Sequence, residues 1–158
     1  MSLRIGDKAP DFSLYSSEKE FIHLHDFQGK NVVLLFFPLA FTSTCTKELC
    51  ETRDDISIYN DLNTEVLGIS IDTLHALARY KADIDLNFKL LSDFNKEVIR
   101  AYDVMYEEYS YGMKGVAKRA VYVIDGEGII RHIEVLEKAG QMPDLEATKE
   151  AIRSLVVA

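Results

Sequence analysis

The run NVVLLFFP, Asn31–Pro38, limits the possible folds more than any other part of the sequence. It is apolar at nearly every position, whereas a strand with one face in water would alternate between apolar and polar residues. Such a run is typical of a strand that is covered on both faces. Pro38 has no N–H to give to a neighbouring strand, so we expect the strand to end there.

Strand-like and helix-like segments alternate along the rest of the chain. Ala9–Phe27 predicts a β-hairpin, with FIHLH as its second strand and SSEKE as its turn. Further strands are expected at 64–72 and 89–93, and in a second hairpin formed by RAVYVID and GIIRHIEVL. Helices are expected at 42–60, 74–84, 95–102 and 144–157, the second capped by Asp72 or Thr73. This order predicts an α/β fold with a central mixed β-sheet, helices on both faces and an N-terminal β-hairpin, which matches a thioredoxin-like core.

Composition fits a single domain over residues 1–158. A chain of 158 residues that is 47% hydrophobic can build a core without disulfides. No apolar run approaches the roughly 18 residues that span a bilayer, and residues 1–11 lack a signal-peptide core, so we expect a cytoplasmic protein with no membrane partner. The net charge of −8, with Lys and Arg scattered, argues against nucleic acid as a partner.

Both cysteines, Cys45 and Cys50, lie just after the buried strand, in PLAFTSTCTKELC. They could form a disulfide, a metal site, a nucleophile with its partner, or two buried side chains. On an intact helix, residues five apart have Cα atoms about 8.7 Å apart. A disulfide needs roughly 4.4–6.8 Å, so these two cannot bond while the helix is formed.

We expect no metal and no organic cofactor. Two thiols five positions apart on a helix diverge, and no histidine stands at local ligand spacing. The chain also has no glycine-rich phosphate loop and no Cys-x-x-Cys motif.

Cys45 is placed in the first turn of its expected helix, with Thr42, Ser43 and Thr44 as candidate capping residues. Free N–H groups and the helix dipole favour a thiolate there, which is the nucleophilic form. Position alone leaves a reactive thiol and a small buried side chain equally open.

The segment FFPLAFTSTC resembles the peroxiredoxin active-site motif Pro-x-x-x-Thr/Ser-x-x-Cys, with Pro38, Thr42 and Cys45 at matching intervals. Arg119 opens RAVYVID as the family's arginine opens its strand, and Glu48 stands at the family's Cys-x-x-Glu position. GDKAPDFSL is similar to the family's opening. The resemblance covers essentially the whole chain.

The resemblance implies a thiol peroxidase in which Cys45 attacks a peroxide and becomes a sulfenic acid. Thr42 would present its hydroxyl to peroxide and thiolate, and Arg119 would stabilise the transition state. Pro38 would shield the site, and Glu48 would orient Arg119. Without the resemblance, Arg119 would be interpreted as a surface arginine.

Cys50 is the one candidate in the sequence for a resolving cysteine, and its bond to Cys45 would require the helix to unwind. Its spacing resembles the peroxiredoxin Q (bacterioferritin comigratory protein) branch. Other segments are similar to the AhpE-like branch, in which a cysteine at this position is not required. Both branches, and a passive Cys50, stay open at this point.

The implied partners are a peroxide substrate and a thioredoxin- or glutaredoxin-like reductant. The Tyr- and Met-rich segment 102–115 predicts either a surface loop or a rim or subunit interface near the active site, and the resemblance implies a homodimer. The alternative function is a non-enzymatic redox sensor or binding module on the same fold.

Overall fold

A computed structural model describes residues 2–156 of the chain. Its strands, in chain order, are β1 (Ser13–Ser16), β2 (Phe21–His23), β3 (Asn31–Phe36), β4 (Thr64–Ser70), β5 (Lys89–Ser92), β6 (Ala120–Ile124) and β7 (Ile130–Val135). Its α-helices are α1 (Ser43–Asp54), α2 (Ile56–Asp61), α3 (Leu74–Asp83), α4 (Glu97–Ala101) and α5 (Leu145–Val156). Two 3-10 helices, η1 (Leu24–Phe27) and η2 (Ser110–Gly112), lie in the connections.

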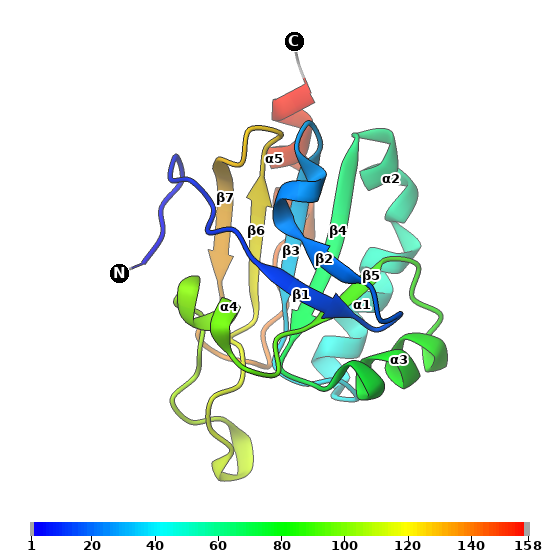
Figure 1. The fold of residues 1–158 in the computed structure, drawn as a ribbon, viewed down its shortest axis with the longest axis vertical. Coiled ribbons are helices and arrows are strands. Elements are labelled where there is room, and N and C mark those ends of the chain that lie inside the picture. Colours follow the sequence, from blue (N-terminus) through cyan, green and yellow to red (C-terminus); the bar gives the residue numbers. More distant parts are fainter. Residues whose placement is uncertain (1, 157–158) are drawn as a thin grey trace.

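Within the described residues the strands form one sheet in the order β2-β1-β5-β4-β3-β6-β7 (Figure 1). Strands β3, β4 and β5 are parallel, whereas β6 runs antiparallel to β3 and pairs with β7 as a hairpin. The predicted mixed sheet and N-terminal hairpin are therefore confirmed. β3 lies between two partners, and its residues after Asn31 are all buried because both faces of the sheet are covered at this strand.

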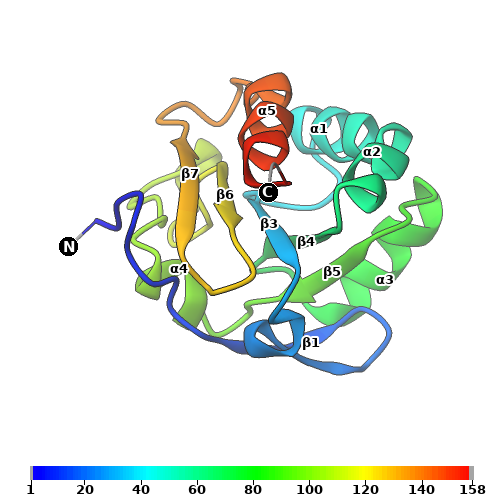
Figure 2. The same cartoon turned by 90° about the horizontal axis from the view of Figure 1, so that it is seen from above.

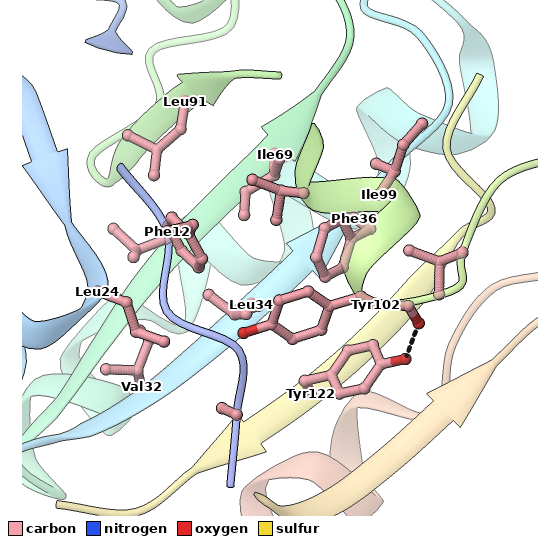
Figure 3. Packing of buried hydrophobic residues seen from close by; sticks show 14 of the residues in the cluster. Phe12, Leu24, Val32, Leu34, Phe36, Ile69, Leu91, Ile99, Tyr102 and Tyr122 are labelled. Atoms are coloured by element: carbon pink, nitrogen blue, oxygen red, sulfur yellow. Dashed lines mark hydrogen bonds between the residues drawn. The ribbon is translucent and has the colours of Figure 1, made fainter. Parts of the chain in front are cut away.

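Helices cover both faces of this sheet. Figure 2 shows α1, α2 and α5 together on one side and α4 on the other. The first side packs around Leu35, Cys45 and Ile152, and it also takes Leu77 and Tyr80 from α3. On the second side, side chains from α4 and the N-terminal segment pack on Leu34 and Phe36 (Figure 3). The apolar run at 31–37 thus supplies both cores, because successive side chains of a strand point to opposite faces.

The single helix expected at 42–60 is wrong, because α1 and α2 are separate helices on either side of Asp55. Asp55 has φ −102° and ψ 11°, and its carboxylate accepts a hydrogen bond of 2.6 Å from Lys149 on α5. No proline or glycine marks this break in the sequence. The residue at the break contacts a residue 94 positions away, and local sequence patterns do not report such a contact.

Other boundaries differ by a few residues. β2 ends at His23 rather than continuing through FIHLH, since the Asp26 carboxylate accepts from the His23 N–H and starts η1. Thr73, the second of the two candidates, caps α3 by accepting from Ala76 N at 3.1 Å. Residue 157, expected to end the last helix, lies outside the described residues. Within residues 2–156, none of the helices combines the length and apolarity needed to cross a membrane.

Candidate active site

The carboxyl end of β3 leads directly into the segment that carries the sequence-predicted site. Pro38 is buried at the start of this segment. The Asp72 carboxylate, just beyond β4, accepts hydrogen bonds from Ala40 N at 2.8 Å and from Ser70 Oγ at 2.7 Å. Asp72 thus fixes the loop between β3 and α1, a role that sequence analysis missed because it assigned Asp72 only as a possible helix cap.

Thr42 is the N-cap residue of α1, but its side chain does not cap the helix. The hydroxyl turns back and donates to Leu39 O at 2.8 Å. The expectation of a capping hydroxyl at Thr42 is therefore wrong, because the side chain is turned toward Leu39 O and its oxygen accepts no N–H of the first helical turn. The oxygen keeps lone pairs that can accept a hydrogen bond from a ligand.

Cys45 is the third residue of α1, and its side chain is fully buried. Its Sγ accepts a hydrogen bond from Arg119 Nη2 at 3.2 Å. Arg119 comes to this point because it immediately precedes β6, whose first residue Ala120 is paired with Phe36 at the end of β3. Residues 74 positions apart in sequence thus meet at one end of the sheet.

Arg119 is held in place by three hydrogen bonds to two partners besides the thiol. Its side chain is only 1% exposed, so the interpretation as a surface arginine is wrong. Nη1 donates to Glu48 Oε1 at 2.8 Å, and Nε and Nη2 both donate to Ala139 O, at 3.1 and 2.8 Å. The carbonyl of Ala139 was missed by sequence analysis, since a backbone acceptor leaves no signal in residue identity.

Glu48 is a buried carboxylic acid with one hydrogen-bonded oxygen. Oε1 accepts from Arg119, whereas Oε2 has no hydrogen-bond partner among residues 2–156. Burial raises the pKa of Glu48 from its ordinary value to about 7, although the charge and hydrogen bond of Arg119 pull it back. One guanidinium therefore serves two neighbours, the carboxyl of Glu48 and the sulfur of Cys45.

Cys50 lies on the same helix but outside this cluster. In the described part of the chain both thiols are free, Cys45 buried and Cys50 half-buried. They lie on the uninterrupted helix α1, in which the predicted separation prevents a disulfide. The structure thus brings together Cys45, Glu48 and Arg119, places Pro38 and Thr42 in the adjoining loop, and leaves Cys50 apart.

Two tyrosines of segment 102–115 pack against one another. Tyr106 donates to Leu136 O at 3.0 Å, and its ring stacks on Tyr109 at 5.9 Å between centroids. Burial raises the pKa of the Tyr109 hydroxyl, and negative charge at Cys45 adds to this. Tyr111, by contrast, is 99% exposed. Segment 102–115 thus has a packed part at Tyr106 and Tyr109 and an exposed Tyr111, and its role as a rim or interface stays a prediction.

The histidines do not form part of this centre. His23 and His25 stack at 4.9 Å on the N-terminal hairpin, and His25 is paired with Asp11 at 2.8 Å. Across residues 2–156, His, Cys, Asp and Glu side chains make no group of three or more that could hold a metal ion.

Together, the sheet and the buried thiol–arginine pair define a redox-active thiol protein on a thioredoxin-like fold. The family model described as AhpC/TSA matches residues 5–133, and the chain belongs to this family.

Individual relatives agree with this assignment. A bcp protein of Coxiella burnetii, whose name places it among the peroxiredoxins, is 41% identical over 132 residues, 82% of this chain and 87% of that protein. The chloroplastic 2-cysteine peroxiredoxin of Chattonella marina var. antiqua is 40% identical over 146 residues, 85% of this chain and 72% of that one. The crystal structure of peroxidoxin BcpB from Mycobacterium tuberculosis is 25% identical, with a TM-score of 0.86 over 97% of this chain and 98% of that one.

These findings confirm the expected activity. Peroxiredoxins are thiol-dependent peroxidases, so this protein is an oxidoreductase that reduces peroxides with electrons from a thioredoxin-type reductant. The enzyme is thereby favoured over the non-enzymatic sensor.

Proposed function

We propose that Cys45 is the peroxidatic cysteine of this peroxidase, acting on hydrogen peroxide and organic hydroperoxides. The observation that carries the proposal is the 3.2 Å hydrogen bond from Arg119 Nη2 to the buried Cys45 Sγ. A guanidinium is permanently charged, so it favours the thiolate over the thiol even where water is excluded.

In the proposed step, the Cys45 thiolate attacks one peroxide oxygen. A sulfur–oxygen bond forms, the O–O bond breaks, and the departing oxygen takes a proton and leaves as water or an alcohol. Negative charge grows on that oxygen, and Arg119 is a fixed donor close enough to stabilise it. Thr42 Oγ1, whose proton is given to Leu39 O, would accept the hydrogen bond of the peroxide O–H.

Glu48 and Pro38 complete the proposed site without reacting themselves. Glu48 fixes one arm of the Arg119 guanidinium at 2.8 Å, which leaves the other arm directed at the sulfur. Buried Pro38 has no N–H that could compete for the peroxide, and it keeps solvent from the thiol side of the loop.

For the return to the thiol, Cys50 is proposed as the resolving residue. Its thiol would attack the Cys45 sulfenic acid, forming the disulfide and releasing water. Because both cysteines lie on α1, the first turns of this helix must unwind before the sulfurs meet. A thioredoxin- or glutaredoxin-like protein would then reduce the disulfide, in keeping with the predicted cytoplasmic location.

Peroxide turnover by the Cys45→Ser and Cys50→Ser variants tests both roles. We expect Cys45→Ser to consume no peroxide, and Cys50→Ser to lose turnover with a thioredoxin donor while still reacting once. Intact mass after one equivalent of peroxide should show a loss of two hydrogens in the wild type and one added oxygen in Cys50→Ser. Unchanged activity in Cys45→Ser would contradict the assignment of the nucleophile, and a wild type that keeps the added oxygen would contradict that of Cys50.

We also propose a homodimer that uses the aromatic surface around the site. Phe41 and Phe94, 57% and 61% exposed, follow the carboxyl ends of the parallel strands β3 and β5 and so lie at the same end of the sheet. Sedimentation should show a dimer at micromolar concentration, shifted toward monomer by Phe41→Ser with Phe94→Ser. Phe21→Ser, at an exposed aromatic of the N-terminal hairpin, is the matched control. A monomeric wild type would contradict the proposal.

A further inference from the structure

The first turn of α1 is tied to α3 by a hydrogen-bond system that the steps above do not use. Thr46 Oγ1 donates to Thr42 O at 2.8 Å, and Tyr80 Oη lies 2.8 Å from the same Oγ1. A hydroxyl has a single proton, and that of Thr46 is already given to Thr42. Tyr80 is therefore the donor to Thr46, in the residue next to Cys45.

Tyr80 is itself rigidly held. Its ring is 1% exposed and packs against Phe37 and Phe41, with centroids 6.4 and 4.9 Å away. Burial raises the pKa of its hydroxyl to about 12, so the hydroxyl stays a donor at every pH at which the enzyme would work. A side chain packed in this way cannot follow Thr46 when the helix unwinds.

We propose that Tyr80 is a positioning residue that holds the first turn of α1 folded and so determines how oxidised Cys45 divides between disulfide formation and further oxidation. The inference rests on the proposed function, because it requires Cys45 as nucleophile and Cys50 as resolving residue. Tyr80 lies on α3, and the proposed roles of Cys45 and Cys50 do not involve it.

The two fates of the Cys45 sulfenic acid differ in what they require of the helix. Disulfide formation joins the two sulfurs, breaks the sulfur–oxygen bond and releases water, and it needs the first turns unwound. Alternatively, a second peroxide transfers one oxygen to the sulfenate, giving a sulfinic acid and water or an alcohol, while the helix stays folded. Only the first route separates Thr46 from Tyr80 and leaves a buried hydroxyl without its partner. Tyr80 therefore slows disulfide formation and leaves the competing oxidation untouched.

Replacing Tyr80 by phenylalanine removes this hydroxyl and keeps the ring. We expect disulfide formation after a single oxidation to become about tenfold faster, because unwinding no longer breaks a buried hydrogen bond. The measurement is intact mass after rapid quenching. The peroxide concentration that converts half of Cys45 to sulfinic acid, seen as two added oxygens, should rise by a similar factor. An unchanged division between the two products would overturn the inference.

Three further variants separate this effect from general loosening of the fold. Tyr59→Phe removes the hydroxyl of another buried tyrosine in the same core, on α2, and should leave the division unchanged. Thr46→Ser retains the acceptor and should match the wild type, whereas Thr46→Val should resemble Tyr80→Phe. The double variant Thr46→Val/Tyr80→Phe should add little to either change, since both remove the same bond. Equal effects of Thr46→Ser and Thr46→Val would contradict the assignment.

Failure of the inference and failure of the proposed function give different results. If the wild type forms the Cys45–Cys50 disulfide but Tyr80→Phe does not change its rate, only the inference is overturned. If the wild type forms no such disulfide, the resolving role of Cys50 fails, and the inference with it. Hydrogen exchange in reduced Cys50→Ser tests the hydrogen bond directly, because Tyr80→Phe should speed exchange in the first turn of α1 about tenfold even there.

Discussion

Replacing Arg119 by leucine is expected to lower the rate constant for reaction with peroxide by about two to three orders of magnitude, the loss found when one fixed donor to developing charge is removed. The same variant should be less stable by about 3–5 kcal/mol, because Glu48 would keep a buried carboxyl without its cationic partner. Stopped-flow peroxide kinetics and urea unfolding measure the two effects.

The double variant Arg119→Leu/Glu48→Leu separates catalysis from folding. With both members of the buried pair replaced by apolar side chains, most of the lost stability should return, because no uncompensated polar group remains at their positions. The rate should stay low, since the donor to Cys45 is still absent. Arg131→Leu is the matched control: its pair with Asp125 is at the surface and should contribute less than about 1 kcal/mol and no activity. Recovery of activity in the double variant would contradict the role of Arg119.

Glu48→Gln is expected to change how stability depends on pH. Burial raises the pKa of Glu48 from 4.5 to about 7 in the folded protein. Between these values the folded chain holds a proton that the unfolded chain has lost, so the free energy of unfolding falls as the pH rises through this window. The fall attributable to Glu48 is on the order of 3 kcal/mol, since one pKa unit corresponds to about 1.4 kcal/mol. Glutamine has no proton to lose, so the variant should lack this fall.

Urea unfolding at pH 5 and pH 8 measures this difference. Both proteins, with Glu48 and with Glu48→Gln, should also carry Cys45→Ser, so that only Glu48 is compared in the pH dependence of unfolding. Glu107→Gln, at an exposed position outside α1, is the control, and its free energy of unfolding should match that of the parent protein at both pH values. Parallel pH profiles for Glu48→Gln and its parent would show that Glu48 titrates normally in the folded state.

The parts of the fold that could be predicted are those with a strong local pattern. The run at 31–38 is apolar because β3 is covered on both faces, so its burial could be predicted from sequence. The site could be predicted only in part. The motif intervals indicated Cys45 and Arg119, but the spatial meeting of the two arises from the pairing of β6 with β3. Residue identities could not show that Ala139 O would hold the guanidinium or that Tyr80 would reach Thr46. Both contacts depend on how distant segments pack.

The break at Asp55 has a consequence for the extent of the motion that the proposed Cys45–Cys50 disulfide would require. A continuous helix from 43 to 61 would unfold cooperatively, because each lost hydrogen bond exposes the next turn. Here the helical hydrogen-bond pattern is interrupted at Asp55, and the Asp55–Lys149 ion pair anchors that point to α5. We therefore expect α1, a helix of twelve residues between the active-site loop and Asp55, to unfold separately from α2. If the proposed disulfide forms, we expect the unwinding of the segment that carries both cysteines to stop at Asp55 and to leave α2 folded.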